Sequence, residues 1–97
     1  MEEQMTVIST GNISKTDIGW LIDRSKEAEG SNTNVVVFEV GDNSGFLIPI
    51  NEEMLKERET FPASFENAVV YAMAKGSDWL MIDPIAKEAA LLRSFDW

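Results

Sequence analysis

The feature that most constrains the fold is a pair of apolar segments separated by a short, turn-forming one. Residues 34–40 read NVVVFEV, the strongest β-strand pattern in the chain, and residues 45–50 read GFLIPI. Between them, residues 41–45 (GDNSG) are residue types that favour tight turns, so the centre of the chain is predicted to be a β-hairpin. The near-continuous apolarity of residues 34–40 predicts burial on both faces, except at Glu39. Pro49 cannot donate to a ladder, so the returning strand lies at a sheet edge or ends there.

The segment before the hairpin contains a strand pattern and then a helix pattern. Residues 5–10 (MTVIST) are short, apolar and β-branched, which is typical of a strand. Ser14 and Asp17 then have the S-x-x-D spacing of a capping box. Apolar side chains follow at positions 18, 21 and 22, which predicts a helix that ends near Gly30.

The segment after the hairpin contains the same two kinds of element. Residues 51–60 (NEEMLKERET) are polar and predict one or two helical turns, with Asn51 as the N-cap. Pro62 suits the first turn of a second main helix, and Gly76 suits its end. The buried stripe of that helix is predicted to be Phe65, Ala68, Val69, Ala72 and Met73. Residues 79–83 (WLMID) read as the last strand, whereas residues 85–93 fit a short helix or a returning strand equally well.

These elements predict a single α+β domain over residues 1–97, in the order β-α-β-β-α-β. That order is typical of the ferredoxin-like split βαβ unit, with two main helices on one face of a four-stranded antiparallel sheet. Pro49 conflicts with this topology, because the third strand is central there. A meander with helices on one face is the alternative.

The residue types in the chain exclude most common kinds of catalysis. There is no cysteine and no histidine, which removes disulfides, thiolate metal sites, Cys nucleophiles and His-dependent triads. Acid–base chemistry would depend on Asp, Glu, Lys or the single Tyr71. Asp78 and Asp83 bracket a predicted strand and lie at its opposite ends, so they are poorly placed to share a metal. We therefore predict a non-enzymatic protein without a cofactor, and a carboxylate-based enzyme is the weaker alternative.

The charge of the chain bears on its partners. Seventeen acidic against eight basic residues give a net charge of −9. Such a field repels nucleic acid, so direct DNA or RNA binding is not expected, but it attracts basic protein surfaces. The alternative is that the acidity only keeps the protein soluble. No apolar run is long enough to cross a bilayer, and the first residues lack the apolar stretch of a signal peptide, so a cytoplasmic location is expected.

The acidic residues are distributed along the chain, but four glutamates share the polar segment after the hairpin with Lys56 and Arg58. A row of carboxylates on one face could imitate the phosphates of nucleic acid and bind a basic partner. The alternative is a solvated helix with pairs such as Glu52–Lys56, worth about 0.2–0.5 kcal/mol each. The candidate partner-binding residues of this segment are Glu52, Glu53, Glu57 and Glu59.

Tryptophans and their neighbouring aspartates are the other candidate contact residues. Trp20 lies off the apolar stripe of the first helix, so its ring could be exposed to a partner. Asp78 precedes Trp79 and Asp96 precedes Trp97, which could present two Asp-Trp anchors. The alternative, which the residue types favour, is that both of these rings fill the edge of the core while the aspartates solvate turns.

Residues 76–83 (GSDWLMID) and the final four residues, SFDW, resemble an uncharacterised family of small bacterial proteins. The family pattern is G-x-D-W-L-x-x-D followed by a C-terminal Y/F-D-W, and its members are carried on plasmids, phages and integrative elements. Ser77 stands where a Cys is common, and Phe95 where a Tyr is common. The D-x-D-G turn expected after the last strand is replaced by residues 83–87 (DPIAK). The resemblance implies a mobile-element setting and no particular chemistry.

Charge and resemblance together predict an anti-defence protein, specifically an anti-CRISPR-like inhibitor. It would occupy a basic nucleic-acid-binding surface on a host protein or ribonucleoprotein complex. The alternative is an accessory or regulatory protein-binding module of a mobile element with no role in immunity.

Overall fold

The helices and strands follow the predicted order along the chain, including the short helical turns predicted after the hairpin. The computed structural model describes residues 4–26, 35–40 and 45–95, so the predictions for Gly30, residues 41–44, Asp96 and Trp97 lie outside the described residues. The short helix α2 and two 3₁₀ turns, η1 and η2, accompany the main elements. In chain order these are β1 (Met5–Ser9), η1 (Thr10–Asn12), α1 (Lys15–Lys26), β2 (Phe38–Val40), β3 (Gly45–Pro49), α2 (Glu52–Leu55), η2 (Arg58–Thr60), α3 (Ala63–Ala74) and β4 (Trp79–Asp83).

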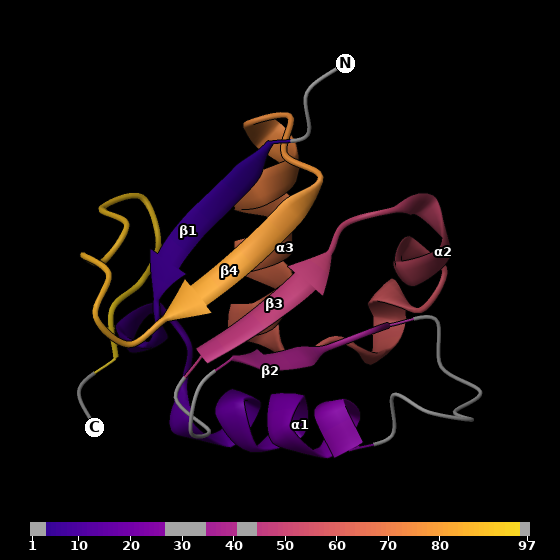
Figure 1. The fold of residues 1–97 in the computed structure, drawn as a ribbon, viewed down its shortest axis with the longest axis horizontal. Coiled ribbons are helices and arrows are strands. Elements are labelled where there is room, and N and C mark those ends of the chain that lie inside the picture. The colour runs from indigo at the N-terminus through magenta and orange to yellow at the C-terminus, as the bar shows by residue number, and fades with distance from the viewer. Residues whose placement is uncertain (1–3, 27–34, 41–44, 96–97) are drawn as a thin grey trace.

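The four strands form a mixed sheet in the order β1-β4-β3-β2 (Figure 1). The hairpin of β2 and β3 is antiparallel, as predicted, and β3 pairs with β4 in the same way. However, β1 and β4 run parallel, in a register that places Met5 beside Trp79. The prediction of a wholly antiparallel sheet is therefore wrong, and the ferredoxin-like arrangement is not confirmed. Pro49, which has no N–H to donate, is the last residue of β3. The strand therefore ends there, as one of the two predictions had it, and does not lie at an edge of the sheet.

The direction of β4 follows from the short helical segment before α3, which makes a separate pass along the sheet. A single helix between β3 and β4 would return the chain to the start of the sheet and make the two strands parallel. Instead, α2 and η2 carry the chain back along the side of the sheet, and α3 then carries it forward again before β4 begins (Figure 1). This extra pass reverses β4, which becomes antiparallel to β3 and parallel to β1.

The core lies between the sheet and its helices. In the view of Figure 1 the helix α3 lies behind the sheet, where it contacts β1 and β4, while α1 lies along the β2 side and contacts both β2 and α3. The largest fully buried side chains include Phe46, Phe65, Ile8, Leu21 and Ile82. Gly76, at φ 71°, ends the turn after α3 in a left-handed conformation that favours glycine, which confirms the predicted helix stop.

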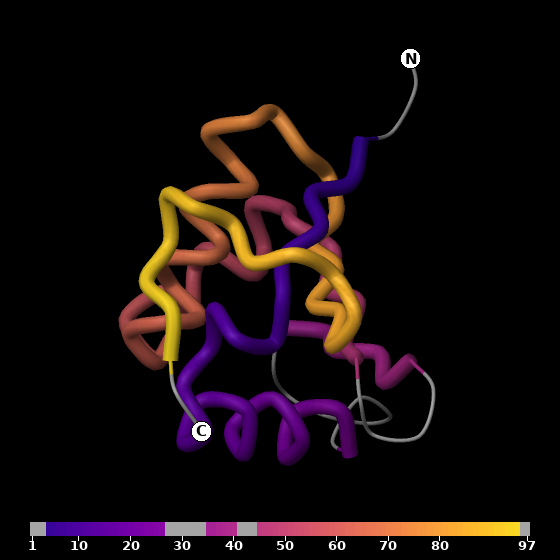
Figure 2. The backbone as a smooth tube through the Cα atoms, turned by 90° about the vertical axis from the view of Figure 1, so that its left-hand side faces the viewer, coloured from indigo at the N-terminus to yellow at the C-terminus, as the bar shows by residue number. Residues whose placement is uncertain are grey.

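The segment after β4 is neither the helix nor the strand that the sequence allowed. Residues 84–95 form turns and irregular chain, which pass the C-terminal end of β1 (Figure 2). The buried side chain of Asn12 holds this segment: its Oδ1 accepts from the Ala89 N–H at 2.9 Å, and its Nδ2 donates to the Arg93 carbonyl at 3.2 Å. The Phe95 N–H also donates to the Gly11 carbonyl at 2.8 Å. Hydrogen bonds to η1 therefore replace the regular ladder that either prediction required.

A hydrogen-bonded cluster joins the N-terminal ends of α1 and α3. As predicted, the Ser14 Oγ accepts from the Asp17 N–H, at 3.2 Å. The Asp17 carboxylate, however, accepts from the N–H of Ser64, at 2.9 Å, and from the Ser64 hydroxyl. The Ser64 Oγ in turn accepts from the Ser14 N–H at 3.0 Å. Because Pro62, at the N-cap of α3, makes no side-chain capping bond, Asp17 supplies the cap from the other helix.

Replacing Asp17 should therefore destabilise the whole domain. We expect Asp17→Ala to lower the free energy of unfolding by about 1–3 kcal/mol, because a cap is lost and the buried donors of Ser64 lose their acceptor. The control is Asp23→Ala, an exposed position on the same helix, which should change stability by less than about 0.5 kcal/mol. Urea denaturation measures both variants, and equal midpoints would show that the two helices are not joined in this way.

Candidate functional site

The face of the sheet turned away from the helices is the candidate functional site. Alternate side chains of a strand point to opposite faces, and the observed register aligns them across the sheet. On the covered face, the side chains are buried: Thr6, Ile8, Phe46, Ile48, Leu80 and Ile82. On the opposite face, here called the open face, the eight apolar side chains are Met5, Val7, Phe38, Val40, Leu47, Pro49, Trp79 and Met81.

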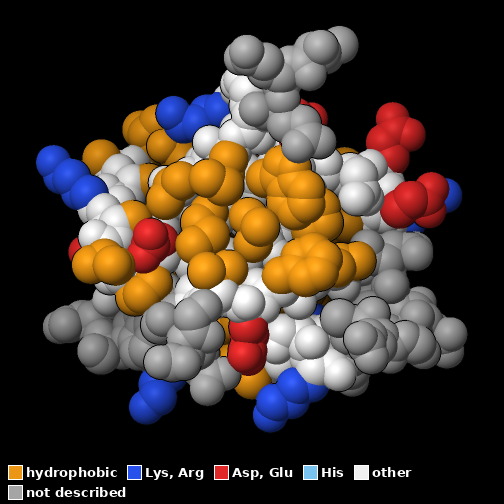
Figure 3. Space-filling view, in the orientation of Figure 1, with side chains coloured by type: hydrophobic (Ala, Val, Ile, Leu, Met, Phe, Trp, Pro, Cys, Tyr) orange, Lys and Arg blue, Asp and Glu red, His pale blue; other side chains and the backbone are white. Residues whose placement is uncertain are grey.

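The open face is apolar and accessible over most of its width. Met5 is 54% exposed, Phe38 is 48% exposed and Val7 is 44% exposed. Figure 3 shows hydrophobic side chains gathered over the middle of the sheet, with most of the charged side chains in that view toward its periphery. None of the described helices covers this face (Figure 1). Contiguous exposed apolar patches on a domain are typical of interaction sites.

The strand β2 shows why the sequence did not predict an exposed apolar face. Residues 34–40 are predicted to be buried on both faces except at Glu39. Glu39 is exposed as predicted, but Phe38 and Val40 are exposed too, and the prediction is wrong for them. Buried Val35 and Val37 precede the strand and pack into the core. The apolar positions of the open face carried the signal, since a strand with water on one side normally alternates with polar residues. The near-continuous apolarity predicts burial on both faces, whereas no described helix covers the second face.

The open face can contribute to binding mainly through burial of its apolar side chains. The carboxylate of Asp83, at the end of β4, belongs to the same face, and its Oδ1 accepts from the Ile85 N–H at 2.9 Å. Within residues 4–26, 35–40 and 45–95, no group of three acidic side chains is arranged to hold a metal ion. Such a surface can release water from apolar groups when a partner covers it, at roughly 25 cal/mol per Å².

The glutamates predicted to contact a partner lie apart from the open face, on α2, η2 and the turn between them. Glu52, Glu53 and Glu59 are exposed, whereas Glu57 is half-buried. The ion pair of Lys56 is with Glu53, at 3.3 Å, rather than the predicted i,i+4 pair with Glu52. Arg58 pairs with Glu66 of α3 at 2.9 Å. Bases are therefore interleaved with the acids in space as well as in sequence.

Trp20 packs within the protein rather than standing out from it. Its ring lies 5.2 Å from that of Phe65 and 6.1 Å from that of Phe61, centroid to centroid. The guanidinium of Arg24 lies over the indole at 5.1 Å. Trp20 is half-buried and belongs to the partly buried layer around the core, so its structural contribution is to join α1 to α3.

The two Asp-Trp pairs are placed differently from each other. The exposed Asp78 accepts from the Gln4 N–H at 3.2 Å, which ties the start of β1 to the start of β4. Trp79 is half-buried and lies on the open face, where it is flanked by Met5 and Pro49. Asp96 and Trp97 lie outside the described residues. Thus the structure brings Trp79, and not its neighbouring aspartate, into the candidate site.

A stability comparison between two neighbouring residues of β1 tests which face is covered. We expect Ile8→Thr to cost about 2–4 kcal/mol, because Ile8 is fully buried and the new hydroxyl would lack water. Val7→Thr, one residue away on the open face, should change the free energy of unfolding by less than about 0.5 kcal/mol. Urea denaturation measures both variants. Similar losses would mean that the open face is covered within the monomer.

Comparison with known proteins places the whole described region in one family. Residues 5–97 match the model of a family described as "Family of unknown function (DUF5983) C-terminal domain". No curated protein and no solved structure matches the chain. Among the described residues, no helix has the length and apolarity that crossing a membrane requires.

Proposed function

The chain belongs to the DUF5983 family of unknown function, and we propose that it is a protein-binding module. Its open face docks onto a partner protein, and Met5, Val7, Phe38 and Trp79 are the central contacts. The proposal makes no use of bond-making chemistry in this chain. Its role is to bind through shape and apolar surface.

One observation carries the proposal: the sheet is apolar on both faces but covered on one. A strand that faces water tolerates polar side chains at every second position, so selection for folding alone does not require Val7, Leu47 or Met81. These three apolar side chains lie side by side on the adjacent strands β1, β4 and β3, in one register. Burial of such a surface by a second molecule lowers the free energy of the complex.

The partner's chemistry follows from the charge of the whole domain. A net charge of −9 is distributed over the chain, and Asp83 lies at one end of the open face. An apolar face on a domain of net negative charge complements a surface that has an apolar centre and Lys or Arg around it. The charge then speeds association and selects the partner, while the apolar centre supplies most of the affinity.

The more specific proposal is an anti-defence, anti-CRISPR-like inhibitor that covers a basic nucleic-acid-binding surface. The net charge and the exposed Glu52, Glu53 and Glu59 support it. The pairing of Glu53 with Lys56 reduces the free charge of that segment, so a contact based only on phosphate imitation is less favoured. The alternative is an accessory module of a mobile element, which docks through the same face but has no target in immunity.

A photo-crosslinking experiment tests whether the open face is the binding surface. A photoreactive phenylalanine analogue is placed at Val7, and for comparison at Val70 on α3, because the two side chains are 44% and 42% exposed. In living host cells we expect a discrete adduct with another protein from position 7 and not from position 70. Mass spectrometry identifies the partner, and Phe38→Asp should abolish the adduct.

Other outcomes of the crosslinking assign the surface differently. An adduct between two copies of this chain would make the open face a homodimer interface. Adducts from position 70 alone would move the binding surface to the helical side and contradict the proposal.

Salt dependence separates apolar docking from charge imitation once the partner is known. Apolar docking predicts that the dissociation rate constant changes by less than about threefold between roughly 0.05 and 0.5 M NaCl, although charge-assisted association slows. Imitation of nucleic acid predicts a dissociation rate constant that rises by about tenfold or more over the same range, together with a large loss of affinity in Glu52→Gln/Glu59→Gln. Surface plasmon resonance measures both rate constants, and Glu66→Gln, whose partner is Arg58, is the matched control.

A further inference from the structure

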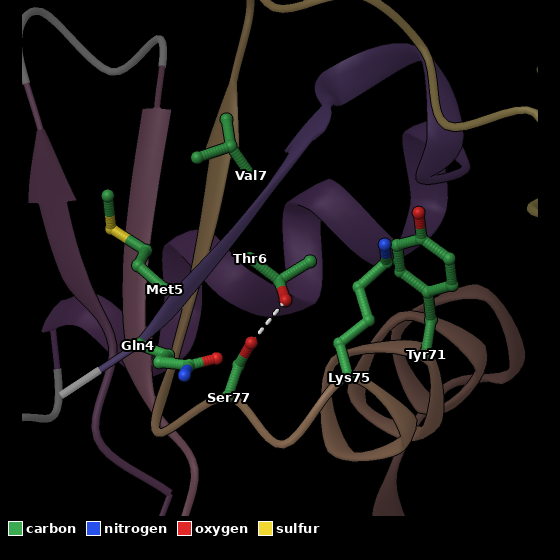
Figure 4. A pocket seen from close by; sticks show the side chains of 7 residues that line it. All are labelled: Gln4, Met5, Thr6, Val7, Tyr71, Lys75 and Ser77. Carbon is green, nitrogen blue, oxygen red and sulfur yellow. Dashed lines mark hydrogen bonds between the residues drawn. The ribbon is translucent and has the colours of Figure 1, made fainter. Parts of the chain in front are cut away.

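A polar groove lies between the outer edge of β1 and the C-terminal part of α3, away from the open face. It encloses about 440 Å³. Its side-chain lining consists of Gln4, Thr6, Tyr71, Lys75 and Ser77 (Figure 4). The proposed docking of the open face does not involve these side chains.

The main chain of β1 forms one wall of the groove. Met5 and Val7 also line it, although their side chains point away from it, toward the open face (Figure 4). The Gln4 carbonyl accepts from the N–H groups of Asp78 and Trp79, at 2.8 and 3.1 Å, so Gln4 is bonded on the β4 side. Because alternate residues of a parallel strand bond to the same neighbour, Met5 and Val7 direct their N–H and C=O groups outward.

Among the described residues, no strand pairs with the outer edge of β1 at this end. In the sheet order β1-β4-β3-β2, β1 pairs only with β4. The segment after β4 returns past the far end of the strand, where Phe95 donates to Gly11 (Figure 2). The unpaired groups of Met5 and Val7 are a template on which an extended segment can add as a further strand.

The groove carries a single positive charge in a strongly acidic protein. Lys75 is exposed, and its ammonium lies 5.1 Å from the centre of the Tyr71 ring. No ion pair joins Lys75 to an acidic side chain of the described residues, and none of the lining residues is acidic. The ammonium is therefore available to a negatively charged group.

Neutral hydrogen-bonding groups complete the groove floor. The hydroxyls of Thr6 and Ser77, both buried, lie 2.5 Å apart and share one hydrogen bond, which leaves one hydroxyl proton for another acceptor. The Gln4 amide lies beside them in Figure 4. These groups suit a ligand that offers main-chain amides and a carboxylate.

We propose that this groove binds an extended peptide segment, which adds to the edge of β1 and places a carboxylate against Lys75. The carboxylate belongs to the C-terminus of the segment. The outward N–H and C=O groups of Met5 and Val7 hold its main chain. The groove uses the main chain of Met5 and Val7, whereas the open face uses their side chains, so the protein has a second binding surface.

Amide NMR tests the proposal without knowledge of the peptide sequence, because main-chain pairing tolerates many sequences. The probe is a mixture of acetylated pentapeptides with randomised residues and a free C-terminal carboxylate, titrated to millimolar concentration. We expect the Met5 and Val7 amide signals to shift in a saturable way. The same mixture with amidated C-termini should bind about tenfold more weakly or worse.

Variants of Lys75 test its role in binding, and a variant of Lys15 is the control. Lys75→Met should weaken the carboxylate mixture at least about tenfold and remove its advantage over the amidated mixture, whereas Lys75→Arg should retain both. Lys15→Met, at the first residue of α1, removes the same charge elsewhere and should leave binding unchanged. The amide spectra themselves report whether each variant is folded.

Three results would overturn the proposal. Absence of shifts at Met5 and Val7 with either mixture would exclude strand addition at this edge. Equal binding of the free and amidated mixtures would exclude the role of Lys75. Equal shifts with sodium acetate alone would make the groove a site for small carboxylates and not for a peptide.

Discussion

An apolar side chain on a strand lowers the free energy of the protein only when other atoms bury it, and this sheet has apolar side chains on both of its faces. On one side, α3 and α1 bury Ile8, Phe46 and Ile82, and this contact is the core of the domain. On the other side, Val7, Leu47 and Met81 stand in the same register without a covering helix among the described residues. The protein thus folds through one face of its sheet and, as we propose, binds through the other.

The composition of the open face depends on two features remote from it. The additional pass of chain through α2 and η2 reverses β4, which brings Trp79 and Met81 between β1 and β3. The cap that Asp17 supplies to α3 fixes that helix against the sheet, because α3 has no side-chain cap of its own. Together they position one apolar row from each of three strands side by side. A change in either feature would therefore rearrange the open face, although neither feature belongs to it.

In the proposed interaction, the acidity and the apolar face serve different steps of binding. Long-range charge governs how often a basic partner is met, whereas burial of apolar area governs how long the complex lasts. The groove beside β1 adds a third element, since its Lys75 gives one positive point in a negative field. A module with two such surfaces can hold a folded partner on the sheet and an extended segment at the strand edge.

The sequence alone determined the local elements: the hairpin pattern of residues 34–50, the Ser14 cap, Pro62 and Gly76 at the ends of the second main helix, and the absence of Cys and His. These depend on neighbours in the chain, whose effects are short-ranged. It did not determine the direction of β4, the irregular path of residues 84–95 or the packing of Trp20 against Phe65. Nor did it reveal the candidate site, because the same apolar pattern in a strand is compatible with a covering helix or with solvent. Only the tertiary structure decided that, since the number of layers over a sheet depends on where distant helices pack.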